Sequence, residues 1–308
     1  MRTIPCSLSA IVPATNQPPT LARCVRAIET AAEPPEDLVV VQEPANGGPG
    51  QARNAGARRA TGDVLVFVDA DVEVHPDAFR RIRTAFEADR VLSALFGSYD
   101  DKPGAPGLVS SFRNLLHHHV HQQAAGPAAT FWAGLGAIRR ETFEATGGFD
   151  EKSFPTASIE DIELGMRLAA AGASVRLDPA LQGTHLKVWS LTDMVRTDFA
   201  RRGVPWVVLL LRRRALPNTL NLGWRHRLSI AAALALVGAS VLRRPAFAAG
   251  AVLILVGLNG SFYALLLRRR GPLEAAAGVG LHVLHHLTAA AAVPAGVLEY
   301  LSACRRTA

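Results

Sequence analysis

A short apolar strand followed by two carboxylates constrains this chain more than any other stretch. Residues 64–68 read Val-Leu-Val-Phe-Val, which is typical of a strand buried on both faces of a parallel sheet. Asp69 and Asp71 follow directly, and on an extended backbone their side chains project to the same side. Paired carboxylates at the carboxyl end of a buried strand favour a Mg²⁺ or Mn²⁺ site. The alternative is that they only end the strand and precede the next helix.

Strand-like and helix-like segments alternate at short spacing through the first part of the chain. We expect strands at 7–12, 38–41, 64–68, 93–97, 131–139 and 174–178, and helices at 21–30, 51–59, 76–88, 108–123 and 159–172. This alternation predicts an α/β fold in which helices cover a Rossmann-like, mostly parallel sheet.

The composition changes after about residue 190. Residues 204–211 are apolar between arginines and suit an interfacial helix. Uncharged runs follow at 228–242, 246–267 and 275–298. As helices, the first would be about 22 Å long and the second about 33 Å, compared with a hydrocarbon core of about 30 Å. We therefore expect a catalytic domain at 1–190, juxtamembrane helices at 191–227, and a membrane region with two to three spans at 228–308.

The net charge is +7, and the arginines crowd beside these apolar runs. That distribution is typical of anchoring on an anionic membrane and not of a nucleic-acid surface, so we expect a membrane partner and no nucleic acid. The basic flanks predict a multi-pass protein of the cell membrane with its N-terminal domain in the cytoplasm. His282, His285 and His286 share one helix face in the third run, where they suit helix packing or an interfacial place better than a functional site.

Three further stretches carry candidate chemistry. Arg53 lies in a helix that opens after a glycine turn, an arrangement that can bind an anion or be a plain turn followed by a surface arginine. Glu160 and Asp161 open another helix, where acids are also ordinary in a first turn. His185 follows a predicted strand. Crowded histidines at 117–121 are more typical of a solvated or headgroup-facing helix than of a metal site.

The order of the motifs is more informative than any one of them. Along the chain come Pro13-Ala14-Thr15-Asn16, Ala52–Gly56, Asp69-Ala70-Asp71, Gly134–Arg140, Gly147–Glu151 and Glu160–Leu168. This ordered set resembles the inverting family 2 glycosyltransferases, which have the GT-A fold. The resemblance covers roughly residues 7–190, and C-terminal membrane spans are frequent in that family.

The resemblance implies a nucleotide-sugar donor, a UDP- or GDP-sugar, and Mg²⁺ or Mn²⁺. It assigns Asp161 as the general base, with Glu160 beside it. The implied donor-binding residues are Pro13, Ala14, Asn16, Glu43, Arg53, Asp69, Ala70 and Asp71. The implied metal ligands are Asp71, Asp69 and His185. For the acceptor, a lipid-linked molecule or an envelope glycan, we expect Trp132, Gly134, Arg202 and Trp206.

One departure from the family pattern affects the nucleotide. The family usually carries Asp-Asp/Asn-Gly-Ser after the second strand to hold the base, whereas this chain has Gln42-Glu43-Pro44. Glu43 can substitute, which leaves the choice between UDP and GDP open. Two other functions are alternatives. One is a sugar nucleotidyltransferase, which needs a glycine-rich loop with a basic residue after the first strand, and the other is a non-catalytic membrane scaffold with a degenerate transferase domain.

Overall fold

The computed structural model describes residues 6–44, 47–214 and 223–307. It divides into two compact units. The first contains the residues up to Ala105 together with His121–Lys187, and the second contains Pro106–Val120 and the residues from Val188 onward. Residues 106–120 therefore belong with the C-terminal part of the chain, a grouping that the sequence does not predict.

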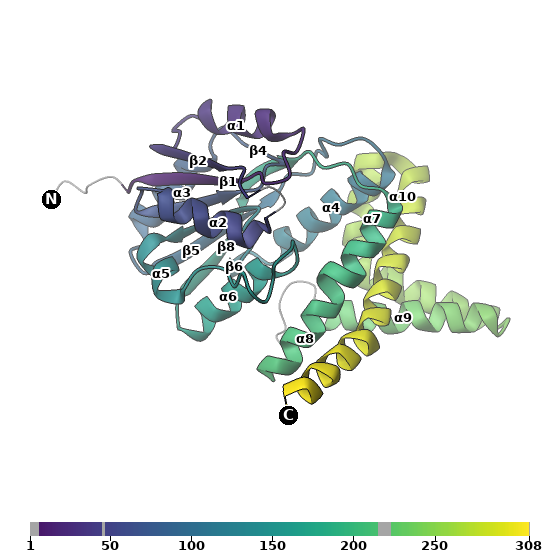
Figure 1. The fold of residues 1–308 in the computed structure, drawn as a ribbon. Helices are drawn as coiled ribbons and strands as arrows, with labels where there is room; N and C mark the ends of the chain where they lie inside the picture. Colours follow the sequence, from purple (N-terminus) through teal and green to yellow (C-terminus); the bar gives the residue numbers. More distant parts are fainter. Residues whose placement is uncertain (1–5, 45–46, 215–222, 308) are drawn as a thin grey trace. The chain divides into compact units, whose positions relative to one another are not determined.

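The first unit contains an eight-stranded mixed sheet with helices on both sides (Figure 1). The strands are β1 (Leu8–Pro13), β2 (Asp37–Val41), β3 (Val64–Val68), β4 (Val72–Val74), β5 (Leu92–Tyr99), β6 (Gly126–Pro127), β7 (Leu135–Arg139) and β8 (Ser174–His185). They are ordered β2-β1-β3-β7-β5-β8-β4, and β6 pairs with β8. Because β1, β2, β3, β5 and β8 run in one direction, the carboxyl ends of β3 and β8 lie at the same edge.

The two faces of the sheet are set by alternation along each strand. The helices of this unit are α1 (Leu21–Glu29), α2 (Pro49–Arg59), α3 (Ala78–Ala88), α5 (Arg140–Thr146) and α6 (Glu160–Ala170). Val64, Val66 and Val68 share a buried core with residues of α1 and α3. Phe67 points to the other face, where its ring lies 5.5 Å from that of Phe143 in α5. Asp69 continues the Phe67 face, which α2 also covers.

Two strands differ from the expectation, and both differences determine which residues lie at the site. Five strands of the sheet run in one direction, as expected, but β7 lies antiparallel between β3 and β5. It begins at Leu135, opposite Val68, so the residues before it lie at the carboxyl edge of β3. The strand expected at 174–178 extends to His185, because its second half pairs with the short strand β4.

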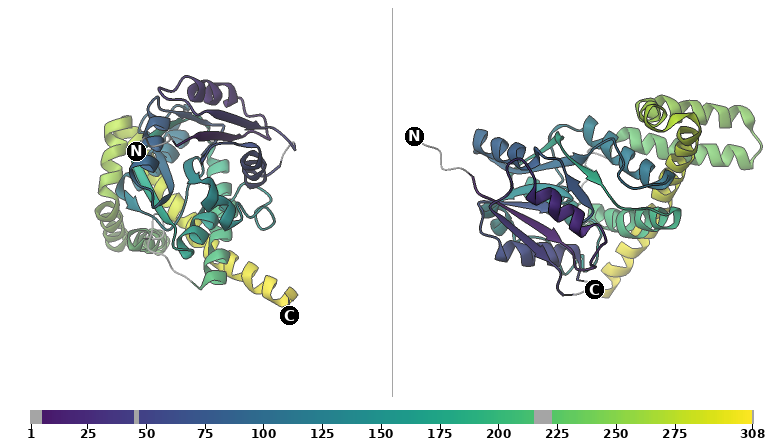
Figure 2. Two further views of the ribbon diagram at one scale, coloured as in Figure 1. Left: turned by 90° about the vertical axis from the view of Figure 1, so that its left-hand side faces the viewer. Right: turned by 90° about the horizontal axis from the view of Figure 1, so that it is seen from above.

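The second unit is helical (Figure 2). It contains the first part of α4 (Leu108–Gln123), then α7 (Leu191–Arg196), the π-helix η1 (Thr197–Gly203), α8 (Val204–Arg213), α9 (Trp224–Val241) and α10 (Pro245–Thr307). α10 contains both of the later apolar runs and is interrupted at Asn259 and at Gly271, where φ is 76°. Within the described residues, one helix, Pro245–Arg305, is long and apolar enough to cross a membrane by length and composition.

A buried polar network ties the helices of the second unit together. Asp198 in η1 lies 2.5 Å from Arg113 of α4 and 2.8 Å from Nδ1 of His285 in α10. Burial by itself raises the pKa of Asp198, but the His285 hydrogen bond and the Arg113 charge lower it overall. The histidines of the third apolar run therefore contact other helices of the unit.

The expectation of a solvated helix is wrong for His121, which is buried and bonds the Gly97 carbonyl.

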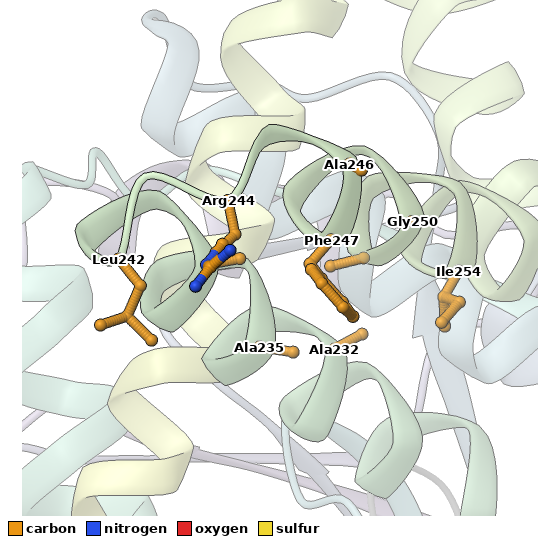
Figure 3. Close-up of a pocket in the computed structure, with 10 residues that line it drawn as sticks. Ala232, Ala235, Leu242, Arg244, Ala246, Phe247, Gly250 and Ile254 are labelled. Atoms are coloured by element: carbon orange, nitrogen blue, oxygen red, sulfur yellow. The ribbon is translucent and has the colours of Figure 1, made fainter.

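A groove of about 540 Å³ lies between α9 and the start of α10 (Figure 3). Its lining is apolar, with Ala232, Phe247 and Ile254 among it, and Arg244 supplies the guanidinium. None of the lining side chains is a carboxylate, an imidazole or a hydroxyl. The groove therefore holds no acid or base for group transfer.

Gly165 of α6 marks a close approach between that helix and the segment before β7. A Cβ at this position would meet the Phe131 amide nitrogen at 2.1 Å and the Thr130 carbonyl carbon at 2.3 Å. We predict that Gly165→Ala destabilises the protein by about 1–3 kcal/mol, although alanine is the better helix former. The matched control is Gly238→Ala in α9, where a Cβ meets nothing within 4 Å, and a small gain is expected. Urea unfolding measures both, and a gain in stability for Gly165→Ala would contradict the packing.

Candidate active site

The two carboxylates at the end of β3 are held by different partners. Asp69 Oδ1 lies 2.6 Å from Arg53 Nη2, and Asp71 Oδ2 lies 3.8 Å from His185 Nε2. Burial raises the pKa of both carboxyls, while the charges of Arg53 and Lys187 oppose the rise. The site is thus a concentration of negative charge that its nearby cations only partly offset.

His185 is held rigidly beside Asp71. It is the last residue of β8, and its register opposite Val72 brings it next to the carboxylate. Its ring is buried and stacks on Tyr99 with 4.1 Å between centroids and an interplanar angle of 13°. Trp132 meets the other side of this cluster, with its ring edge-on to Tyr99 at 4.9 Å. The imidazole therefore has a fixed direction, as a metal ligand requires.

The second acidic pair lies at the start of α6. Glu160 is buried and uses both oxygens, accepting from Arg53 Nη1 at 2.9 Å and from the Ser158 amide at 2.9 Å. Asp161 accepts a hydrogen bond from the Ala133 amide at 3.2 Å. Burial, with Glu160 next to it, raises the pKa of Asp161 to about 6, although Arg53 acts in the opposite direction. A carboxyl with this pKa is suited to accept a proton near neutral pH.

A closed ring of contacts joins the two acidic pairs. The Asp69 amide donates to the Gly134 carbonyl at 3.0 Å, and the neighbouring Ala133 amide donates to Asp161. On the other side, Arg53 bridges Asp69 and Glu160. Residues that are far apart in sequence therefore form one site at one edge of the sheet.

The expected donor residues lie at the ends of β1 and β2. Pro13 pairs with Val41, and the Ala14 amide donates to the Val41 carbonyl at 2.8 Å. Asn16 and Glu43 follow these two strands and are exposed. Ala70 is buried, and its carbonyl accepts from Thr20 Oγ1 at 2.8 Å.

The expected acceptor residues do not all belong to this unit. Trp132 and Gly134 lie at the site, and the Trp132 ring occupies the space that a Gly134 side chain would need. Arg202 and Trp206 lie in the second unit, in η1 and α8. Arg202 is exposed and Trp206 is partly buried.

Two contributors were not predicted from the sequence. Tyr99 supports His185, but an aromatic residue just beyond a predicted strand carries no signal of that role. Lys187 contributes positive charge at Asp69 and Asp71. It lies two residues after His185, so attention to charge next to the predicted metal ligand would have found it.

A divalent ion fits the donor set at the end of β3. Asp71 offers carboxylate oxygens, which suit Mg²⁺ and Mn²⁺, and His185 offers an imidazole nitrogen, which suits transition-metal ions. Among the described residues, no three His, Cys, Asp or Glu side chains form a complete metal site. Two protein ligands are enough where phosphate oxygens and water supply the others, as is usual for ions that bind with a phosphate substrate.

Comparison with known proteins identifies the first unit. Residues 25–147 match the sequence family described as Glycosyl transferase family 2. The chain contains a family 2 glycosyltransferase domain. The matched range includes Arg53, Asp69 and Asp71 of the site.

Curated relatives of the glycosyltransferase domain cover about half of this chain. The chain is 30% identical over 181 residues to "Probable glycosyltransferase YdaM" of Bacillus subtilis, covering 56% of this chain and 42% of the relative. It is 28% identical over 171 residues to the "Pre-mycofactocin glycosyltransferase" of Mycobacterium tuberculosis, covering 52% of this chain and 34% of the relative. The chain thus spans less than half the length of either relative.

A solved structure agrees with the fold over nearly the whole chain. The mannosyltransferase PcManGT of Pyrobaculum calidifontis, in complex with GDP-Man and Mn²⁺, superposes with a TM-score of 0.55. The match covers 97% of this chain and 88% of that one at 19% sequence identity, so it concerns the fold alone. The expected GT-A class is confirmed by this likeness.

The raised pKa of Asp161 makes a prediction about stability. The folded-state pKa of about 6 lies above the ordinary value of 3.8, so the folded protein binds a proton more tightly than the unfolded chain. Stability should fall as the pH rises through this window. Asp161→Asn keeps one acceptor oxygen for the two amides, of Ala133 and Ile162, that bond the carboxylate. We predict that its stability relative to the wild type rises by about 1–3 kcal/mol as the pH increases through the window. Urea unfolding at several pH values tests this, and an equal difference below the window would contradict it.

Proposed function

We propose that this chain is an inverting, membrane-associated glycosyltransferase that uses a divalent cation to move a sugar from a nucleotide sugar to an acceptor. The observation that carries the proposal is the closed ring joining Asp69 to Asp161 through Arg53, Glu160 and Ala133–Gly134. A transferase needs a donor diphosphate site and a base for the acceptor within one site. The family 2 match over residues 25–147 supports the same reaction class.

The donor's diphosphate would bind at the end of β3. Asp71 and His185 would hold Mg²⁺ or Mn²⁺, which when bound neutralises charge on the departing diphosphate. Asp69 lies beside them and would face the donor's ribose. Lys187 adds positive charge at the same carboxylates. Support for this reading comes from the donor set and from burial, which raises the pKa of both carboxyls, because a bound cation would offset the cost of keeping them charged.

Asp161 would remove the proton from the incoming acceptor hydroxyl. Glu160 is less suited to this role because it is paired with the Arg53 guanidinium. Asp161, by contrast, accepts hydrogen bonds from the Ala133 and Ile162 amides and has a pKa raised to about 6. A base placed opposite the leaving group gives inversion, and such proton transfer typically contributes about 10²–10⁴-fold to the rate. If the acceptor is a lipid phosphate, which arrives ionised, Asp161 would serve to position it.

The nucleotide is a UDP or GDP group in this proposal. Pro13, Ala14, Asn16 and Glu43 would surround the base, since they follow two adjacent strands at the same edge. The Pyrobaculum structure contains GDP-Man, but at 19% identity it does not choose the donor for this chain. Glu43, which stands where the family usually has an aspartate, is the side chain best placed to decide between the bases.

Exposed apolar residues support membrane association of the second unit. Among the described residues, the exposed large hydrophobic side chains other than Val91, Val188 and Leu191 all lie between Trp224 and Leu301. Phe247 and Leu253 are 75% and 72% exposed. Leaving this surface in water would be costly, whereas a bilayer would cover it. With Arg225 and Arg227 beside the first run, the proposed orientation keeps the catalytic domain in the cytoplasm.

A membrane-bound unit is of use when the acceptor is itself at the membrane. We therefore propose a lipid-linked or envelope glycan acceptor, with Trp132 and Gly134 facing it beside Asp161. Arg202 and Trp206, in the second unit, are proposed to meet its head group. A soluble acceptor would not need the apolar helices.

The other two functions are less well supported. A sugar nucleotidyltransferase needs a basic, glycine-rich loop after β1, where this chain has Pro13-Ala14-Thr15-Asn16. A non-catalytic scaffold has no use for a buried guanidinium that links two acidic pairs. The glycosyltransferase proposal accounts for both features.

A panel of nucleotide sugars tests the reaction class. We predict that the full chain in detergent or membranes releases nucleoside diphosphate from one UDP- or GDP-sugar, and that Mn²⁺ stimulates the release. Asp71→Asn should lower the activity by at least about 100-fold, because the cation loses its carboxylate. Asp77→Asn, which alters a carboxylate outside the site, is the control and should keep full activity. Formation of nucleoside triphosphate and sugar 1-phosphate, when pyrophosphate is added to the nucleotide sugar, would point to the nucleotidyltransferase.

Flotation with lipid vesicles tests membrane association. We predict that the wild-type chain floats with anionic vesicles, and that the double variant Phe247→Asp with Leu253→Asp floats at least about tenfold less, since a buried aspartate is costly in the bilayer. Val91→Asp is the matched control, because Val91 is 78% exposed but lies in the first unit. A wild-type chain that stays with the soluble fraction would contradict membrane association.

A further inference from the structure

Arg53 contacts both acidic pairs of the site. Its Nη2 lies 2.6 Å from Asp69 Oδ1, and its Nη1 lies 2.9 Å from Glu160 Oε1. The residue is 3% exposed, and its guanidinium carbon lies 5.4 Å from the centroid of the Phe149 ring. Both terminal nitrogens are therefore occupied by protein carboxylates, which leaves them poorly placed to bind a donor phosphate as well.

We propose that Arg53 is a positioning residue that sets the separation between the donor-side carboxylate Asp69 and the helix start that carries Asp161. In this role it binds neither sugar nor phosphate. The kinetic consequences of this inference rest on the proposed transferase function, whereas the contact itself does not.

The planar guanidinium is what makes such a link possible. Its two terminal nitrogens point in fixed directions, so one side chain can hold two carboxylates at a set distance. Glu160 is in turn tied to the Ser158 amide through its second oxygen. A shift of Glu160 would therefore move the first turn of α6 and the adjacent Asp161 with it.

A lysine could not replace this arrangement. Its ammonium is a compact charge on a flexible chain and cannot hold both carboxylates in one plane. It would keep the positive charge that acts on Asp69 and Asp161. Comparison of lysine and glutamine at this position thus separates the geometry of Arg53 from its charge.

Backbone hydrogen bonds that do not involve the Arg53 side chain should allow Arg53 variants to fold. The Asp69 amide still bonds Gly134, and the Ala133 amide still bonds Asp161 when Arg53 is changed. Asn54, the next residue of α2, also keeps its bonds to the Phe149 amide and carbonyl. Loss of Arg53 therefore removes one of two connections and leaves α2 docked.

The experiment measures kcat and the donor KM across pH for Arg53→Lys and Arg53→Gln in the full chain. Arg58→Lys is the matched control, since Arg58 is exposed on the same helix and should behave as wild type. We expect Arg53→Lys to lower kcat by about 10–100-fold with little change in the donor KM, because small displacements of reacting groups are costly. The acid limb of the pH profile of kcat should not move in Arg53→Lys. Arg53→Gln should in addition move the acid limb of kcat upward by about one pH unit, since a positive charge near Asp161 is gone.

Two results would overturn the proposal. A raised donor KM with an unchanged kcat would make Arg53 a donor ligand. Equal loss in both variants with no movement of the acid limb in Arg53→Gln would make it a structural residue only. Glu160→Gln probes the same link from its other end and supplies a second variant if Arg53→Gln does not fold. The double variant Arg53→Lys with Glu160→Gln should be no slower than the slower single variant, because both break one connection.

Failure of the proposed function is distinguishable from failure of this inference. If the wild type transfers no sugar from any donor, the link is read from unfolding instead. The pH midpoint of the stability difference between the wild type and Asp161→Asn is then measured again in the Arg53→Gln and Arg53→Lys backgrounds. We expect this pH midpoint to be higher in the Arg53→Gln background and unchanged in the Arg53→Lys background. An unchanged midpoint in the Arg53→Gln background would overturn the proposed role of Arg53.

Discussion

The crowding of carboxylates in a partly buried space is the constraint on which the first unit depends. Asp69, Asp71, Glu160 and Asp161 come from two separate segments. Burial raises the pKa of Asp69, Asp71 and Asp161, and neighbouring carboxylates add to the rise for Asp69 and Asp161. Arg53 is the buried cation in contact with both segments. The positive charge is not enough to return the pKa of Asp161 to its ordinary value. A cation bound at this edge of the sheet, as proposed, would stabilise the charged form of these buried carboxylates.

Packing around the carboxylates fixes their directions. His185 is stacked on Tyr99, and Trp132 makes a T-shaped contact with the same Tyr99 ring. On the opposite face, Phe67 packs against Phe143 and Phe149, which also lies under the Arg53 guanidinium. Rigid aromatic contacts of this kind keep polar groups in place without occupying their hydrogen-bonding atoms. The apolar core and the polar site are therefore built from the same strands.

The helical unit follows a different physical logic. It exposes many large apolar side chains, while its interior contains the ion pair between Arg113 and Asp198, joined by His285. The unit also buries an apolar core that includes Phe112, Met194 and Phe262, so the exposed apolar side chains are additional to a packed interior. A buried charge pair of this kind specifies which helices meet, because a wrong partner would leave a charge without compensation.

Much of the fold could be read from the chain because strands and helices have different periods. The strand at 64–68, the helices at 108–123 and 159–172, and the order of the family motifs all follow from local pattern. The direction of β7 could not be predicted, since hydrophobic pattern marks a strand but not its partner. The full length of β8 was also missed, because its second half is polar and is held by β4.

The candidate site divides along the same line. The residue types and their order are properties of the sequence alone. They comprise the acids Asp69, Asp71, Glu160 and Asp161 and the imidazole of His185. Only the folded chain decides that Arg53 turns inward to bridge two acids, that Tyr99 supports His185, and that residues 106–120 join the helical unit. The physical reason is that a local sequence pattern indicates which side chains are buried. The residues that they contact depend on how segments far apart in sequence pack together.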